Sequence, residues 1–175
     1  MRALVVFESM FGNTQEIAKA IADGLSPTMS VDLAEVGTAP AVIGEDVDLL
    51  VVGGPTHAHG MSKPESRADS ARRAGDRLVS RGTGIREWLE AVRGGSPKVA
   101  AAAFDTRIKG PEMLWGSAAK AAHKRLRGLG FRVVVPPQSF LVSGPTGPLF
   151  DRLVEGEAER ARQWGEKLGS KLTAR

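Results

Sequence analysis

Two continuous apolar runs constrain the fold of this 175-residue chain more than any other feature. Residues 47–53 read VDLLVVG and residues 98–104 read KVAAAAF. A strand with one face in water alternates apolar and polar side chains, so these runs predict strands that are buried on both faces. Such strands occur in parallel sheets that carry helices on both sides.

The remaining sequence predicts helices that alternate with further strands. Strands are expected at residues 2–8, 31–36 and 131–142, and helices at residues 13–24, 85–92, 117–129 and 149–168. Asn13 is expected to cap the first helix together with Glu16, and Gly24 to end it. Pro136 and Pro137 interrupt the last strand, which places that strand at an edge of the sheet because proline has no N–H to donate.

This order of elements predicts one α/β domain over residues 1–175. We expect a three-layer α/β/α sandwich with a five-stranded parallel sheet in the order 2-1-3-4-5. Ligands of such sheets bind beyond the carboxyl ends of the strands, between strands one and three. The loops expected there are residues 9–13, 54–84 and 105–114.

Composition narrows the classes of function. The chain has no cysteine, which excludes disulfides and zinc–thiolate sites, and we expect no metal site. No apolar run approaches the roughly 20 residues that span a bilayer, and the first one ends at Glu8, too early for a secretory signal. We therefore expect a cytoplasmic protein with no membrane partner.

The net charge of +4 has two interpretations: an arginine-rich solvated surface, or a surface that meets an anionic partner. Basic residues gather at residues 63–81, but no aromatic residues lie among them to stack on bases. A nucleic-acid partner is therefore not expected. The wider segment 63–84 is predicted to be either a mobile surface loop with a marginal helix, or a lid or partner-docking element beside the site.

The loop after the first strand, SMFGNT, also has two interpretations. A helix begins there, and its backbone N–H groups and dipole attract anions. Gly12 permits a tight turn with positive φ, while Ser9, Asn13 and Thr14 offer neutral hydrogen-bonding groups. These features fit a phosphate monoester held without lysine or arginine. In the alternative, Gly12 and Asn13 serve only as a turn and a cap.

Two segments resemble the flavodoxin-like family. VFESMFGNTQEIAKAIADGL, at residues 6–25, is similar to its phosphate-loop signature, with Ser9, Gly12, Asn13 and Thr14 at the matching positions. VVGGPTH, at residues 51–57, is similar to the end of the third strand and the second flavin loop. The resemblance covers nearly the whole chain, and it implies a flavoprotein that binds flavin mononucleotide (FMN) non-covalently and transfers electrons.

The resemblance also implies which residues contact FMN. They are Ser9, Met10, Phe11, Gly12, Asn13 and Thr14 at the phosphate, Pro55, Thr56, His57, Ala58, His59 and Gly60 beside the ring, and Phe104, Asp105, Thr106 and Arg107 on its other side. Family members usually stack the ring between aromatic residues, often Trp and Tyr, but this chain has no tyrosine. Stacking is therefore expected from Phe11, His57, His59, Met61 or Trp115.

Three functions remain open at this point. The first is electron transfer to or from a redox partner protein or a small-molecule donor or acceptor. The second is an FMN-dependent oxidoreductase that reduces quinones or other small molecules, and the third is a flavin-free binding domain. Positive charge from His57, His59 and Arg107 is expected to favour the anionic reduced flavin. The sequence predicts no catalytic residue and no oligomeric state.

Overall fold

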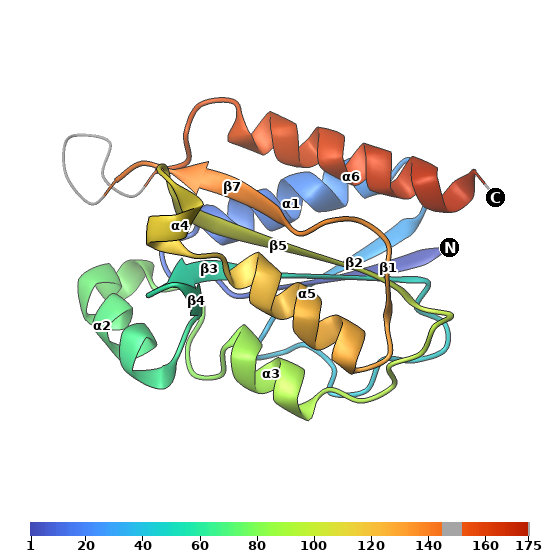
Figure 1. Cartoon of the computed structure of the whole chain (residues 1–175), viewed down its shortest axis with the longest axis horizontal. Helices are drawn as coiled ribbons and strands as arrows, with labels where there is room; N and C mark the ends of the chain where they lie inside the picture. Colours follow the sequence, from blue (N-terminus) through green and yellow to red (C-terminus); the bar gives the residue numbers. More distant parts are fainter. Residues whose placement is uncertain (145–151, 175) are drawn as a thin grey trace.

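A computed structural model describes residues 1–144 and 152–174, and it shows one sheet with helices on both faces (Figure 1). The strands are β1 (Arg2–Phe7), β2 (Ser30–Glu35), β3 (Leu49–His57), β4 (Gly60–Met61), β5 (Ala100–Ile108), β6 (Arg132–Val133) and β7 (Gln138–Val142). The helices are α1 (Asn13–Leu25), α2 (Pro64–Ala74), the 3₁₀ turn η1 (Gly75–Arg77), α3 (Ile85–Ala91), α4 (Glu112–Trp115), α5 (Ala118–Gly128) and α6 (Glu157–Thr173).

The strand order confirms the predicted parallel sheet. The main path runs β2-β1-β3-β5, and both β6 and β7 pair with β5 in parallel. Pro136 and Pro137 lie between β6 and β7, so the fifth strand of the predicted order is present in two short pieces. The small strand β4 pairs antiparallel with the end of β3.

Side chains of β1 show how the sheet joins the two helical layers. Ala3, Val5 and Phe7 pack in the apolar cluster that includes α1 and α6, while Leu4 and Val6 pack in the cluster that includes α3 and α5. Figure 1 shows these helix pairs on opposite faces of the sheet. Within the described residues, no helix combines the length and apolar character needed to cross a membrane.

The first helix begins at Asn13 as predicted, but the predicted roles of Asn13 as its cap and of Gly24 as its end are wrong. The N-cap is Gly12, with φ of +99° and no side-chain cap bond, so Asn13 is the first helical residue. At the other end, Gly24 lies inside α1, where an added Cβ would stand 2.0 Å from the carbonyl oxygen of Arg162 in α6. Gly24 therefore permits close helix packing, which the pattern of a single helix does not reveal.

The last helix begins later than predicted. Residues 149–151 of the expected helix lie outside the described residues. Residues 152–156 are not helical, because Leu153 pairs with Val142 as an antiparallel bridge. Gly156, with φ of +86°, is the N-cap of α6, and Ala161 and Leu168 are buried on one face of the helix.

The two central strands extend beyond their apolar runs. β3 continues to His57 and β5 to Ile108, and the extensions pair with each other at Gly54–Asp105 and Pro55–Thr106. Residues that were expected in loops thus lie on rigid backbone at the carboxyl edge of the sheet.

Candidate functional site

A cleft of about 220 Å³ opens at the carboxyl edge of the sheet. Its lining comes from all three segments predicted to meet there, together with residues of α2 and β7: Ser9, Met10, Phe11, Asn13, Thr14, Pro55, Thr56, His57, Arg73, Thr106, Arg107, Ile108 and Val142. Two arginines are present and, among the residues described, no acidic side chain lines the cleft. Arg73 also pairs with Asp69 of α2 at 3.0 Å, whereas Arg107 forms no ion pair with a described residue, so the lining itself is suited to an anion.

The first wall is the turn between β1 and α1. Gly12 adopts φ of +99°, and apart from its two chain neighbours no atom of a described residue lies within 4 Å of the place that a Cβ would occupy. Gly12 itself does not line the cleft, but Phe11 and Asn13 on either side of it do. The hydroxyl of Ser9 accepts a hydrogen bond from the Gly12 N–H at 3.1 Å, which holds the turn closed. The N–H groups of Thr14 and Gln15, in the first turn of α1, have no acceptor within the helix. The turn thus combines open space with the positive end of a helix dipole.

Residues 79–80, far from this turn in the sequence, hold it through hydrogen bonds. The Ser9 N–H donates to the Ser80 hydroxyl at 2.9 Å, and the Ser80 N–H donates to the Ser9 carbonyl at 2.7 Å. The Val79 N–H donates to the carbonyl of Met10 at 3.2 Å. The sequence did not predict Ser80 as part of the site, because residues 63–84 carry no clear periodicity.

The second wall is the end of β3. Its hairpin with β4 turns through Ala58 and His59, both with positive φ, as in a two-residue type I′ turn. Pro55, Thr56 and His57 line the cleft. Ala58, His59 and Gly60 do not line it, and the backbone of His59 instead pairs with Gly116 after α4.

The hydrogen bonds of Ser66 assign the proton of His57. The Ser66 hydroxyl donates its one hydrogen to the Lys63 carbonyl at 3.0 Å, so it can only accept from His57 Nδ1, also at 3.0 Å. Burial, with the charge of Arg67 nearby, lowers the pKa of His57 to about 4. His57 is therefore neutral at pH 7, with Nε2 as an acceptor. The expectation that it adds positive charge to the site is wrong.

The third wall comes from β5, and only half of the residues predicted there reach the cleft. The Phe104 ring is buried under Gly53, where an added Cβ would stand 2.2 Å from it. The fully buried Asp105 carboxylate points to the start of α5, and its Oδ2 accepts from the Ser117 hydroxyl at 2.7 Å and the Ala119 N–H at 2.9 Å. The sequence prediction did not separate these buried residues from Thr106 and Arg107, which line the cleft.

One hydroxyl pair joins the first and third walls. Thr14 Oγ1 and Thr106 Oγ1 are 2.7 Å apart and both side chains are buried. Thr56 links the second wall to the third in the same way, since its hydroxyl donates to Asp105 Oδ2 at 3.0 Å. The three predicted loops are therefore braced against one another by neutral side chains and one carboxylate.

Two of the five residues predicted to stack on a flavin line the cleft, namely Phe11 and His57. Met61 packs against the apolar cluster on the α3 and α5 face of the sheet. Trp115 lies against Gly110, where an added Cβ would stand 2.5 Å from its Nε1. Neither Met61 nor Trp115, nor His59, lines the cleft in this structure.

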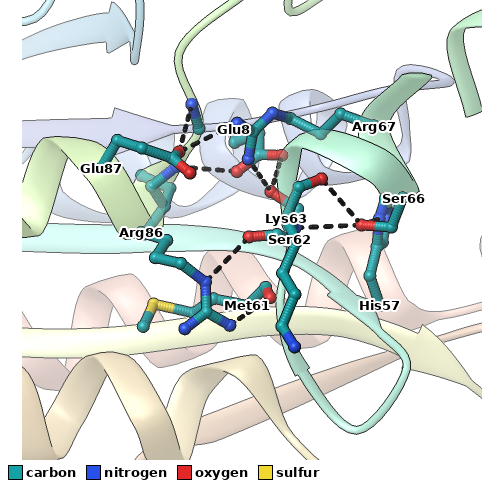
Figure 2. A network of polar contacts seen from close by, with 11 residues as sticks. Glu8, His57, Met61, Ser62, Lys63, Ser66, Arg67, Arg86 and Glu87 are labelled. Carbon is teal, nitrogen blue, oxygen red and sulfur yellow. Dashed lines mark hydrogen bonds and ion pairs between the residues drawn. The ribbon is translucent and has the colours of Figure 1, made fainter.

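Beside the cleft, a buried polar network attaches α2 to the body of the protein (Figure 2). Glu8, at the end of β1, is 1% exposed and accepts from the Ser62 hydroxyl and from the Ile85 N–H at 2.8 Å. Burial raises the pKa of Glu8. Arg67 donates to the same Ser62 hydroxyl at 2.9 Å and pairs with Glu87 of α3 at 3.0 Å.

Within segment 63–84, the helix α2 is attached to the rest of the protein through Arg67. Arg67 is 8% exposed although it belongs to a polar helix, because its guanidinium contacts Ser62 and Glu87. Next to it, Arg86 of α3 donates to the Met61 carbonyl of β4 at 2.7 Å. The sequence contains one indication of this network: Glu8 is a charged residue directly after a buried strand.

The donors and space of the cleft fit FMN. The turn at Gly12 offers an anion open space and the amino end of α1, and Arg73 and Arg107 add positive charge. Phe11 and the neutral ring of His57 offer flat surfaces of the kind that pack on an aromatic ring. When bound, FMN supplies the redox chemistry, because it accepts and releases one or two electrons.

Comparisons with known proteins identify the family of this chain. The family model described as flavodoxin matches residues 5–165. Similar solved structures include a flavodoxin from the domain Archaea, 18% identical over 99% of both chains with a TM-score of 0.63. Another is Flavodoxin 1 from Bacillus cereus, 19% identical over 99% of this chain and 98% of that one, with a TM-score of 0.65.

A third similar structure is the rubredoxin:oxygen oxidoreductase from Desulfovibrio gigas, which is 16% identical. The match covers 99% of this chain but 36% of that chain, with a TM-score of 0.60. No curated protein sequence matches this chain. At such identities the structural matches show the fold, and the family model identifies the family over nearly the whole length. This chain therefore belongs to the flavodoxin family, and its function is that of the family, electron transfer with bound FMN.

Proposed function

We propose that the cleft at the carboxyl edge is the FMN site of this protein, with the phosphate in the turn of residues 9–14. The observation that carries the proposal is the open space at Gly12, at the amino end of α1 and between Phe11 and Asn13, which line the cleft together with two arginines. Neutral donors and guanidinium groups together suit a phosphate monoester.

The surrounding residues then have distinct roles. Ser9 and Thr14 fix the turn, the first through the Gly12 N–H and the second through Thr106. Phe11 and His57 flank the ring, and His57 offers it an acceptor nitrogen, since Ser66 holds Nδ1 in its protonated form. Arg107 is kept near the ring by its bond of 2.9 Å to the Gly110 carbonyl.

A matched pair of glycine substitutions tests the phosphate site. Gly12 and Gly156 are both helix N-caps with positive φ, and apart from chain neighbours no atom of a described residue lies within 4 Å of an added Cβ at either. Alanine at either position has the same backbone strain, about 1 kcal/mol. Gly12→Ala is expected to weaken FMN binding about tenfold in an absorbance titration of the apoprotein, whereas Gly156→Ala leaves it unchanged. Equal effects of the two substitutions would contradict the assignment.

The proposal includes a redox partner protein and a cytoplasmic location. The absence of cysteine fits a reducing compartment. A second candidate function is an FMN-dependent quinone or small-molecule reductase. It is favoured by the small number of aromatic residues in the cleft, because Phe11 and His57 leave room for a substrate over the ring. Repeated reduction of a quinone by NAD(P)H would support this candidate, and a single turnover would favour the carrier.

A further inference from the structure

Exposed apolar residues lie next to the cleft, on the short helix α4. Met113 is 93% exposed, Leu114 60% and Trp115 40%, and they are the only consecutive large apolar residues so exposed in the described chain. Trp115 contacts Gly110, whose carbonyl accepts from Arg107 of the cleft. The backbone bridge from Gly116 to His59 joins this helix to the β3–β4 hairpin. A protein that covered α4 would therefore lie at the mouth of the cleft.

The positive charge of the chain is concentrated around the same place. Residues 63–84 and 107–120, which we call the basic rim, contain nine basic and four acidic residues, whereas the rest of the chain contains 15 basic and 16 acidic ones. Figure 1 shows α2 and α4, which belong to the rim, at the end of the molecule toward which β3 and β7 point. The basic rim thus carries a net charge of +5, and the rest of the chain carries −1.

Several charges of the basic rim are available to a partner. Arg77, Arg81 and Lys109 are exposed, and none forms an ion pair with a described residue. Exposed cations around apolar side chains match the composition of a protein interface, an apolar centre with a charged border. They do not match a nucleic-acid surface, because Trp115 is the one aromatic residue of the rim.

We propose that α4 and the basic rim form the docking surface for a redox protein whose own contact surface is acidic around an apolar centre. The acidic border steers the partner to the rim, and Met113 and Leu114 are buried on contact. The inference rests on the proposal that the cleft holds FMN, because docking there brings the partner's redox centre to the flavin.

Binding to proteins of opposite charge tests the proposal. A [2Fe–2S] ferredoxin of net negative charge and a basic cytochrome c serve as probes, measured by calorimetry and by stopped-flow electron transfer. We expect the ferredoxin to bind and to exchange electrons about tenfold faster at ~0.01 M than at ~0.5 M salt. For cytochrome c we expect electron exchange that does not slow as the salt concentration rises. The reverse pattern, or tighter binding of a short DNA duplex than of ferredoxin, would overturn the proposal.

Substitutions outside the cleft locate the surface. The double variant Arg77→Glu/Lys109→Glu and the single variant Met113→Ser are each expected to weaken ferredoxin binding about tenfold. Lys98→Glu, which reverses one charge where the double variant reverses two, is the remote control, because Lys98 is exposed just before β5, at the opposite edge of the sheet. An effect of Lys98→Glu as large as that of the double variant would also overturn the proposal.

FMN uptake and ferredoxin binding, measured separately, distinguish a failure of this inference from a failure of the FMN proposal. If the protein takes up FMN but the rim variants bind ferredoxin like the wild type, the docking surface is wrong and the FMN site stands. If the protein takes up no FMN, while calorimetry shows the expected loss in the rim variants, the FMN site is wrong and the docking surface stands.

Discussion

His57 illustrates how one hydroxyl determines the chemistry of a neighbouring side chain. Ser66 donates to the Lys63 carbonyl and accepts from the Lys63 N–H, so the remaining interaction, with His57 Nδ1, requires a proton on that nitrogen. At pH 7 the nitrogen spectrum of His57 is expected to show protonated Nδ1 and unprotonated Nε2. Ser66→Ala is expected to allow both tautomers. A wild-type His57 protonated at Nε2 would contradict this assignment.

The same residue gives a pH dependence of stability. The pKa of His57 is about 4 in the folded protein, where burial disfavours the charged ring, and about 6.5 in the unfolded chain. Between these values the unfolded chain binds more protons, so the free energy of unfolding falls as pH decreases from 6.5 to 4, by roughly 3 kcal/mol. Above pH 6.5 the contribution is constant. Urea denaturation at each pH measures this dependence. In His57→Gln the free energy of unfolding is expected to fall less between pH 6.5 and 4 than in the wild type. An equal fall in both proteins would refute the assignment.

At the scale of single elements, glycines control how closely α1 and α6 approach. An added Cβ at Gly165 would stand 2.4 Å from the Ile21 carbonyl oxygen, whereas nothing lies within 4 Å at Gly128, the last residue of α5. Gly165→Ala is expected to destabilise the protein by about 2 kcal/mol through overpacking. Gly128→Ala is expected to stabilise it by about 0.5 kcal/mol through helix propensity. Chemical denaturation measures both, and equal effects would contradict the close contact.

The sequence predicted elements well where apolar periodicity is strong, and less well where tertiary contacts set their ends. The buried runs placed β3 and β5 and hence the sheet order. The extensions of these strands through Pro55 and Thr106 depend on their pairing with each other, which local composition does not encode. Asp105 was predicted at the flavin from the family resemblance, and nothing in the sequence indicated that its carboxylate is buried and holds the start of α5.

At the scale of the whole molecule, the uneven charge distribution affects the flavin's potential. Arg73 and Arg107 line the cleft, and no acidic residue does so in the described part of the chain. Positive charge favours the anionic reduced flavin, so the second one-electron step is expected at a less negative potential than in a flavodoxin with acidic surroundings. Arg73→Gln is expected to lower this potential by roughly 30–60 mV. The remote control Lys98→Gln should leave it unchanged; equal shifts in spectroelectrochemical titrations would contradict the account.

The central claim is that the turn around Gly12 holds the phosphate group of FMN. Titration of the apoprotein with FMN and with riboflavin, which lacks the phosphate, tests it most directly through the visible absorbance of the bound flavin. The account predicts one FMN per chain and about 100-fold weaker binding of riboflavin, because each hydrogen bond to a charged group contributes about 1.5–3 kcal/mol. Equal affinity for the two flavins, or uptake of neither, would contradict it.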